Sequence, residues 1–425
     1  MARAIQAGRA AGVAAAVLVA AAAGFGGALA AAAVTASPVL FLGAGGALTA
    51  LVAAGSLRLV LKRGRRVRSI AWLVGGLVAL GAAAVLVPLG DPRTQDVVPG
   101  MRYWSLPTGS RLAYVRIPGA EPRRSTPVVV LHGGPGIPDM AGDAAYFGRL
   151  SALRYDVYVY DQLGSGRSTR LPDPTGYGVG RDVADLEGVR QAIGARQMVL
   201  VGHSYGGLLA AHYLAAHPDS VERLVLSSPG PLDPADTSTD RATAGLDTGA
   251  RLRTYAAALQ PRALLGYLLT RVDVRAAHAY LPDVEADARN DTILTLAEPA
   301  LHCTPAQAHG PVRGSGFYRL QLPQSSGGAA PADPRPGLTG LPTPVLIFRG
   351  SCDYLSWRSA LDYRRTLPHA GLVYLDGAGH NTYQDRPTEV LADVTAFLTD
   401  SPLPIPALDD EAVERLAPRD ASGPR

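Results

Sequence analysis

The stretch "QMVLVGHSYGGLLAAHYLAAH", residues 197–217, decides the fold of this chain. It begins as a short apolar run typical of a buried strand, turns at "GHSYG", and continues as an apolar helical run. In the pattern G-x-S-x-G, a serine at a sharp turn from a strand into a helix has its hydroxyl raised above the sheet edge. Small residues on both sides, here Gly202 and Gly206, permit that strained turn. The pattern therefore favours Ser204 as a catalytic nucleophile over a small residue in an ordinary turn.

The chain around this stretch alternates between strand-like and helix-like segments. From about Met101, short apolar runs are separated by glycine-rich turns and amphipathic runs. Strands that alternate with helices indicate an α/β fold with a mainly parallel sheet. The segments predicted to contain strands are 127–136, 155–168, 197–204, 221–230, 344–353 and 371–380, and the predicted helices are 181–195, 205–217 and 387–398.

A serine hydroxyl is a weak nucleophile, so it needs a base that is itself oriented by an acid. In folds with this turn, the chain order is serine, then Asp or Glu, then His, each at the end of a strand. Asp353 and His380 both follow predicted strands and fit that order. Asp376 is the alternative acid, although it lies only four residues before the histidine. The predicted triad is Ser204, Asp353 and His380.

The oxyanion of an acyl-transfer intermediate needs two backbone N–H donors. One should be Tyr205, directly after the nucleophile. The other should come from the loop "HGGPG", residues 132–136, with Gly134 as the first choice and Gly133 as the alternative. His132 in the same loop is better placed to support the loop by hydrogen bonding than to act as the base.

The motifs "HGGPG", "DQLGSGRS", "GHSYGG", "GSCD" and "GAGH", in this order and spacing, resemble the α/β-hydrolase superfamily. Over about residues 100–400 they look like its proline iminopeptidase branch of serine peptidases. The resemblance implies release of an N-terminal residue, often proline, through an acyl-enzyme on Ser204, with no metal or organic cofactor. The family usually has G-G-S-W-G at the elbow, where this chain has His203 and Tyr205. An esterase or amidase acting on small molecules is the alternative, and a binding domain without catalysis is disfavoured because the whole triad is present.

The sheet pattern stops between 231 and 341, where helical runs such as 248–259 and 262–272 predict a helical cap. One acidic stretch of this cap could hold the free amine of a peptide substrate, and the alternative is a solvated helix face. The carboxylates of that stretch are Asp283, Glu285, Asp287, Asp291 and Glu298, of which Glu285, Asp287 and Asp291 are the predicted substrate-binding residues.

Two cysteines remain, Cys303 in the cap and Cys352 beside Asp353. Outside the cytoplasm a disulfide between them is permitted, and it would tie the cap to the rim of the active site. Two free thiols are the alternative.

The N-terminal part has three apolar segments, 10–36, 39–61 and 69–90. About 20 apolar residues suffice to cross a bilayer as a helix. The basic run 58–68 between the second and third segments should stay in the cytoplasm, so the chain after Asp91 should lie outside it. The first segment also resembles a cleavable signal peptide, which would leave two spans and the same final orientation.

Charge separates this part from the remainder of the chain. No acidic residue precedes Asp91, and the eight basic residues before it leave a net charge of −4 on the rest of a chain whose total is +4. The pI of about 9.1 therefore reflects the N-terminal segment and does not indicate nucleic-acid binding. The predicted organisation is a membrane-spanning part at 1–90, an α/β core at 100–230 and 342–400, a cap at 231–341 and a flexible tail at 401–425.

Overall fold

The computed structural model describes residues 2–60, 85, 97–236, 238, 242–322 and 333–417. The chain forms two compact units. One comprises Met1–Asp91 and Ala258–Ala286, and the other Pro92–Ala257 and Asp287–Arg425.

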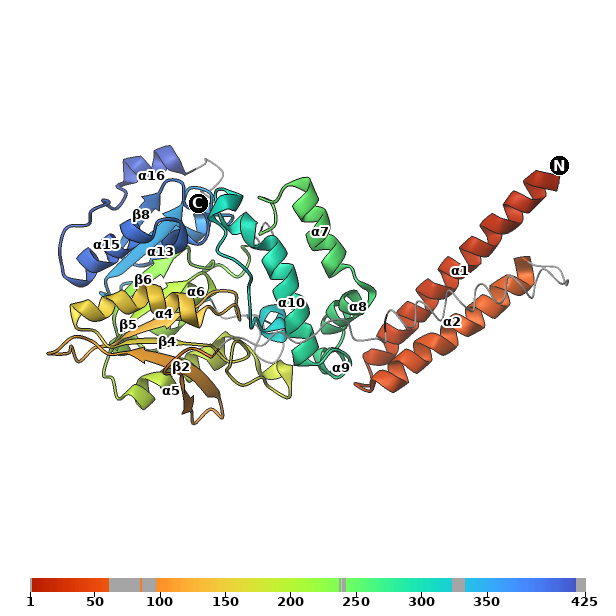
Figure 1. The fold of residues 1–425 in the computed structure, drawn as a ribbon, viewed down its shortest axis with the longest axis horizontal. Coiled ribbons are helices and arrows are strands. Elements are labelled where there is room, and N and C mark those ends of the chain that lie inside the picture. The colour runs from red at the N-terminus through yellow and green to blue at the C-terminus, as the bar shows by residue number, and fades with distance from the viewer. Residues whose placement is uncertain are drawn as a thin grey trace. The chain divides into compact units, whose positions relative to one another are not determined.

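The larger unit is built on an eight-stranded sheet with the order β1-β2-β4-β3-β5-β6-β7-β8. Figure 1 labels β2, β4, β5, β6 and β8 of this sheet. The first two strands pair antiparallel with their neighbours, and the pairs from β4 through β8 are parallel. The strands are β1 (Arg102–Ser105), β2 (Arg111–Ile117), β3 (Val128–Leu131), β4 (Val157–Tyr160), β5 (Met198–His203), β6 (Val221–Ser227), β7 (Val345–Gly350) and β8 (Ala370–Leu375). The α/β fold predicted from the sequence is confirmed.

The central strands are apolar and buried along their length, as expected for a parallel sheet that is covered on both faces. Helix α4 (Met140–Phe147) and helix α15 (Pro387–Leu398) contribute side chains to one core with β3, β4 and β5. Helices α5 (Val179–Ile193) and α6 (Tyr205–Ala216) pack against each other. The carboxyl ends of the parallel strands meet at one sheet edge, which is where open α/β sheets bind ligands.

Further helices follow the strands and fill the insertion. Those assigned wholly or mainly to the larger unit are α7 (Thr248–Ala258), α10 (Asp283–Ala297), α11 (Phe317–Gln321), α12 (Arg335–Leu338), α13 (Trp357–Thr366), α14 (Thr382–Asp385) and α16 (Asp410–Leu416). Short 3-10 turns lie at Gly148–Leu153, Pro174–Gly176, Pro218–Ser220, Glu298–Leu301 and Pro305–Gln307. Helix α16 lies within the tail that the sequence predicts to be flexible.

The smaller unit contains two long apolar helices, α1 (Ala2–Ala32) and α2 (Pro38–Val60), which run side by side (Figure 1). Their backbones approach closely: a Cβ at Gly24 would lie 2.8 Å from the carbonyl oxygen of Gly45. Small residues at such crossings are typical of helices that pack in a bilayer. Within these helices, Ala11–Ala32 and Pro38–Ser56 are long and apolar enough to cross a membrane.

The same unit includes α8 (Pro261–Thr270) and α9 (Val274–Tyr280). The ring of Tyr280 contacts that of Phe41 edge-on, with 6.2 Å between centroids. The third predicted membrane segment, 69–90, lies outside the described residues except for Val85. The carbonyl of Val85 accepts hydrogen bonds from Arg262 and Tyr280.

Candidate active site

Ser204 lies at the turn between β5 and α6, where the sequence predicts the nucleophile. Its backbone has φ 52° and ψ −117°, a strained conformation for a residue with a side chain. Glycine is required on both sides, because a Cβ at Gly202 would lie 2.5 Å from the carbonyl oxygen of Gly206. A Cβ at Gly206 would in turn overlap the carbonyl oxygen of Leu131. The strand, the turn and the neighbouring strand therefore hold the serine in place together.

His380 and Asp353 come together from the ends of two neighbouring strands, β8 and β7. The histidine Nδ1 is 2.8 Å from Asp353 Oδ1, and both side chains are buried. Burial opposes ionisation of Asp353, but the charge and hydrogen bond of His380, together with Arg349 and the Leu355 N–H, outweigh it and lower the carboxyl pKa to about 2. The Arg349 guanidinium contributes in the same direction, with Nη1 2.8 Å from Asp353 Oδ2. The acid that bonds to His380 is thus Asp353, while the backbone carbonyl of Asp376 accepts a hydrogen bond from Arg386.

The loop that follows β3 lies beside Ser204. Gly133 and Gly134 both line the cavity that contains Ser204. A Cβ at Gly133 would lie 3.1 Å from the Cβ of Ser204, so this backbone passes directly beside the serine. Gly134 has φ 116°, which glycine adopts without strain. On the other side, Tyr205 is the first residue of α6, and its N–H has no acceptor within the helix.

His132 supports this loop. Its Nε2 accepts a hydrogen bond from the Gln162 N–H at 2.9 Å, and its Nδ1 is 2.9 Å from the carbonyl oxygen of Gly133. Because Nε2 is the acceptor, Nδ1 carries the proton and donates to Gly133. Burial lowers the pKa of His132 to about 4, so the ring is neutral at pH 7.

Ser204, His380 and both loops line one cavity of about 540 Å³. Tyr354, next to Asp353, also lines it, hydrogen-bonds to Ser204 and packs its ring 4.5 Å from that of His380. The remaining wall is largely apolar, with Val98, Ile137, Met140, Leu294, Leu301, Val312 and Leu320. Such a wall suits an apolar part of a bound small molecule.

The three predicted substrate-binding carboxylates bond to protein groups. Glu285 forms a two-point ion pair with Arg262 in the smaller unit. In the larger unit, Asp287 pairs with Arg170, and Asp291 accepts the N–H groups of 314 and 315. Neither Asp287 nor Asp291 is among the described residues that line the cavity. Glu298 of the same acidic stretch does line it.

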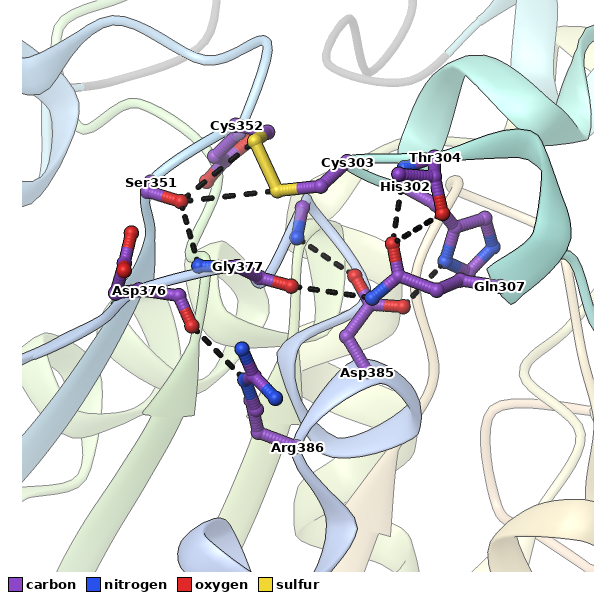
Figure 2. The surroundings of a disulfide bond; sticks show 12 residues. His302, Cys303, Thr304, Gln307, Ser351, Cys352, Asp376, Gly377, Asp385 and Arg386 are labelled. Atoms are coloured by element: carbon purple, nitrogen blue, oxygen red, sulfur yellow. Dashed lines mark hydrogen bonds and ion pairs between the residues drawn. A yellow bond between two sulfur atoms is a disulfide. The ribbon is translucent and has the colours of Figure 1, made fainter.

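Cys303 and Cys352 form a disulfide, which Figure 2 shows with its surroundings. His302, directly before Cys303, lies between Asp385 and Glu298, at 2.6 Å and 2.7 Å. Burial disfavours its charge, but the hydrogen bonds and the charges of these two carboxylates together outweigh burial and raise the pKa of His302 to about 9. Sequence reasoning did not single out His302, Asp385 or Tyr354, because no motif contains them and their partners are far along the chain.

Comparisons with known proteins place this chain among the α/β hydrolases. The family model described as "alpha/beta hydrolase fold" matches residues 126–387. A proline iminopeptidase of Heyndrickxia coagulans is 40% identical over 124 residues, which are 29% of this chain and 41% of the relative. A (lyso)-N-acylphosphatidylethanolamine lipase of Bos taurus is 28% identical over 305 residues, 67% of this chain and 82% of the relative. The chain thus spans about two fifths of the iminopeptidase and most of the lipase.

Solved structures with a similar fold include two hydrolases. Proline iminopeptidase of Mycobacterium smegmatis is 21% identical with a TM-score of 0.45, covering 71% of this chain and 98% of its own. An esterase of Rhodococcus sp. ECU1013 is 20% identical with a TM-score of 0.47, at the same coverage. At these identities the likeness concerns the fold alone.

Proposed function

Because the chain belongs to the α/β-hydrolase fold family, we propose that it is a serine hydrolase whose triad is Ser204, His380 and Asp353. The observation that carries this proposal is the hydrogen-bonded pair of His380 and Asp353, which borders the cavity where the strained turn presents Ser204. A strained serine, a buried histidine and an ionised buried acid are what nucleophilic acyl transfer requires.

In the proposed reaction, Ser204 Oγ attacks the carbonyl carbon of the substrate, and His380 Nε2 takes the hydroxyl proton. Asp353 accepts from Nδ1–H, which fixes the ring orientation and stabilises the imidazolium. The N–H groups of Tyr205 and of Gly134, or of Gly133, stabilise the oxyanion. The imidazolium then protonates the leaving group. Water, deprotonated by the same histidine, releases the acyl group from Ser204.

Release of an N-terminal residue is the first candidate reaction, and Glu298 is the observation that favours it. This carboxylate is 7% exposed and lines the same cavity as Ser204. With His302 charged, Glu298, His302 and Asp385 together keep one net negative charge, which matches a substrate ammonium. The buried carboxyl of Asp143 in the same wall is less suited to this at pH 7, because burial raises its pKa to about 8 and keeps it mostly protonated. Glu298 is therefore the proposed partner of the free amine.

Hydrolysis of an acyl ester or amide without a free amine is the second candidate. It is favoured by the apolar part of the wall, including Ile137, Leu294 and Val312. The longer match to a relative named as a lipase also supports it. Both candidates use the same triad, so they differ only in what the cavity recognises.

A substrate panel tests both candidates. The full chain in detergent would be given prolyl and alanyl anilides with free amines, their N-blocked counterparts, and nitrophenyl acyl esters. Turnover of free-amine anilides but not of their N-blocked counterparts indicates an aminopeptidase, and Glu298→Gln should then raise KM for free-amine anilides more than KM for any ester that the chain hydrolyses. Turnover of esters alone indicates an esterase. Ser204→Ala should remove all turnover at an unchanged melting temperature, and full activity in that variant would refute the mechanism.

We further propose that the apolar N-terminal helices anchor the enzyme in a membrane with the hydrolase unit outside the cytoplasm. The length and composition of α1 and α2 support the anchor. The basic run 58–68 supports the orientation.

A further inference from the structure

The loop that carries His380 is held by a segment of the cap, residues 298–307. The backbone N–H of His380 donates to the carbonyl oxygen of Leu301 at 2.7 Å. The amide of Gln307 donates to the carbonyl oxygen of Gly377 at 3.1 Å, in the same loop (Figure 2). The position of the proposed base therefore depends on the cap as well as on β8.

Gly379 shows how closely the two segments approach. A Cβ at this position would overlap the carbonyl oxygen of Leu301 and lie 2.6 Å from the Cα of His302. Only glycine leaves room for the cap backbone to lie directly on the loop. The glycine before the histidine in "GAGH" is thus explained by contact with the cap.

His302 forms ion pairs on both sides of this contact, with Asp385 and with Glu298. Its Nδ1 is 2.6 Å from Asp385 Oδ1, and the other oxygen of Asp385 accepts the N–H of Gly379 at 2.6 Å. Its Nε2 is 2.7 Å from Glu298 Oε1, which also accepts the N–H of His309. The His302 side chain is fully buried, and the ring of His309 lies 5.7 Å away. Both ring nitrogens face carboxylates, so the imidazolium form satisfies all of these groups.

The disulfide between Cys303 and Cys352 lies next to His302 in the chain. Cys303 follows His302, and Cys352 precedes Asp353, the hydrogen-bond partner of His380. The N–H of Cys352 also donates to the carbonyl oxygen of Ala378, in the histidine loop. The bond between the two sulfurs therefore connects the segment that holds His380 to the strand end that carries its acid.

We propose that the segment Glu298–Cys303 is the positioning element of His380, with His302 as its positioning residue, and that the Cys303–Cys352 disulfide makes hydrolase activity depend on oxidation. This inference rests on the proposed function. A dithiol reductant supplies two electrons and two protons, so that the S–S bond breaks, two thiols form and the reductant becomes a disulfide. The segment is then held only by its hydrogen bonds and ion pairs. A misplacement of about 1 Å in a catalytic group can reduce the rate roughly 100-fold.

The test compares the oxidised full chain in detergent with the same protein after treatment with dithiothreitol and alkylation, with thiols counted in each sample. The substrate is the ester or anilide that the oxidised chain hydrolyses. With an ester substrate we expect kcat to fall by about 10-fold or more on reduction and KM to change less than about 2-fold, because positioning affects the reacting groups rather than substrate binding. With a free-amine anilide KM should rise as well, because Glu298 belongs to the same segment and lines the cavity. Reoxidation of unalkylated protein should restore kcat. Cys303→Ser/Cys352→Ser should have the low kcat and show no response to the reductant.

His302→Gln should lower kcat in the oxidised protein as well. His278→Gln is its matched control, because it removes another histidine–carboxylate pair, with Asp283, and should leave kcat unchanged. A wild-type kcat in protein with two free thiols, or in His302→Gln, would overturn the proposal.

Hydrogen exchange gives a readout that does not depend on turnover. A peptide covering residues 376–381 contains the His380 N–H bonded to Leu301 and the Gly379 N–H bonded to Asp385. Reduction should increase its deuterium uptake, and unchanged protection would overturn the proposal even if no substrate were found. Absence of any Ser204-dependent turnover in the oxidised chain would instead refute the proposed function, so the two failures are distinguishable.

Discussion

At the scale of single residues, Asp353 offers the sharpest test of the triad. Its carboxylate accepts from His380 Nδ1, so Asp353→Asn should favour the wrong tautomer of the ring and reduce kcat by about 10⁴-fold. Because its pKa is about 2, the wild-type acid should stay ionised above pH 4. Steady-state kinetics with any substrate from the panel measure the effect. Asp376→Asn is the control, since it alters the alternative acid, and it should keep kcat within about 2-fold. The opposite ranking of the two variants would reassign the acid.

The three residues of the predicted triad share one property. Ser204, Asp353 and His380 each follow an apolar strand, and parallel strands bring such ends to one edge. No such rule applied to His302 and Asp385, because their contact joins the cap to the last residue of α14, 83 residues later in the chain. The cap carboxylates were chosen by charge alone, and charge does not reveal that arginines pair with Glu285 and Asp287 and that backbone N–H groups bond to Asp291.

At the scale of elements, α11 is held to the core by one buried arginine. Arg319 is fully buried, with Nη2 in an ion pair with Asp182 of α5 and 2.7 Å from the hydroxyl of Tyr205 on α6. Arg319→Met leaves the Asp182 charge buried without its partner, which should lower the free energy of unfolding by about 3–5 kcal/mol. Denaturant unfolding measures this loss. Arg319→Met/Asp182→Asn should recover part of it.

The control for this prediction is Arg335→Met, which breaks the pair with Asp333 at the surface. That pair is partly exposed, so its loss should change the free energy of unfolding by less than about 1 kcal/mol. Equal effects of Arg319→Met and Arg335→Met would mean that the buried pair does not hold α11 in place.

The junction between the cap and the core should make stability depend on pH. The pKa of His302 is raised from about 6.5 in the unfolded chain to about 9 in the folded protein. Because the folded protein binds this proton more tightly than the unfolded chain does, the protonated His302 stabilises the fold fully below pH 6.5. That contribution is lost as pH rises through 9. The loss should be on the order of 3 kcal/mol. Thermal unfolding from pH 6 to 10 would measure it, and the difference between wild type and His302→Gln should shrink over that range. A constant difference would contradict a charged His302.

Elements were predictable to different degrees for physical reasons. The parallel strands are continuous apolar runs bounded by glycine turns, so β3 through β8 could be located from the sequence. The antiparallel pair β1 and β2 could not be located from the sequence. These strands, "RYWS" and "RLAYVRI", are half exposed and carry charges at exposed positions, so they are not continuous apolar runs. Helix α10 has polar and apolar residues without a clear stripe, since several of its carboxylates are bonded inside the protein.

At the scale of the whole molecule, the chain joins an apolar unit to a hydrolase unit. Helices α8 and α9 of the cap region group with α1 and α2, and the carbonyl of Val85 accepts from both Arg262 and Tyr280. Removing the N-terminal residues would therefore take away contacts of those two helices. Measurements on the enzyme should accordingly use the full chain in detergent.

The proposed orientation of that chain in a membrane rests on where its charges lie. Basic residues next to membrane spans stay in the cytoplasm, and the run 58–68 contains six of the eight basic residues that precede Asp91. A disulfide between Cys303 and Cys352 also persists more readily outside the cytoplasm. A reporter phosphatase that folds only when its disulfides form should be active when fused after residue 425 and inactive when fused after residue 68. The second fusion is the matched control, because it has the same reporter and the first two apolar segments. Activity at residue 68 with silence at residue 425 would place the hydrolase unit in the cytoplasm, where the Cys303–Cys352 bond would be kept reduced.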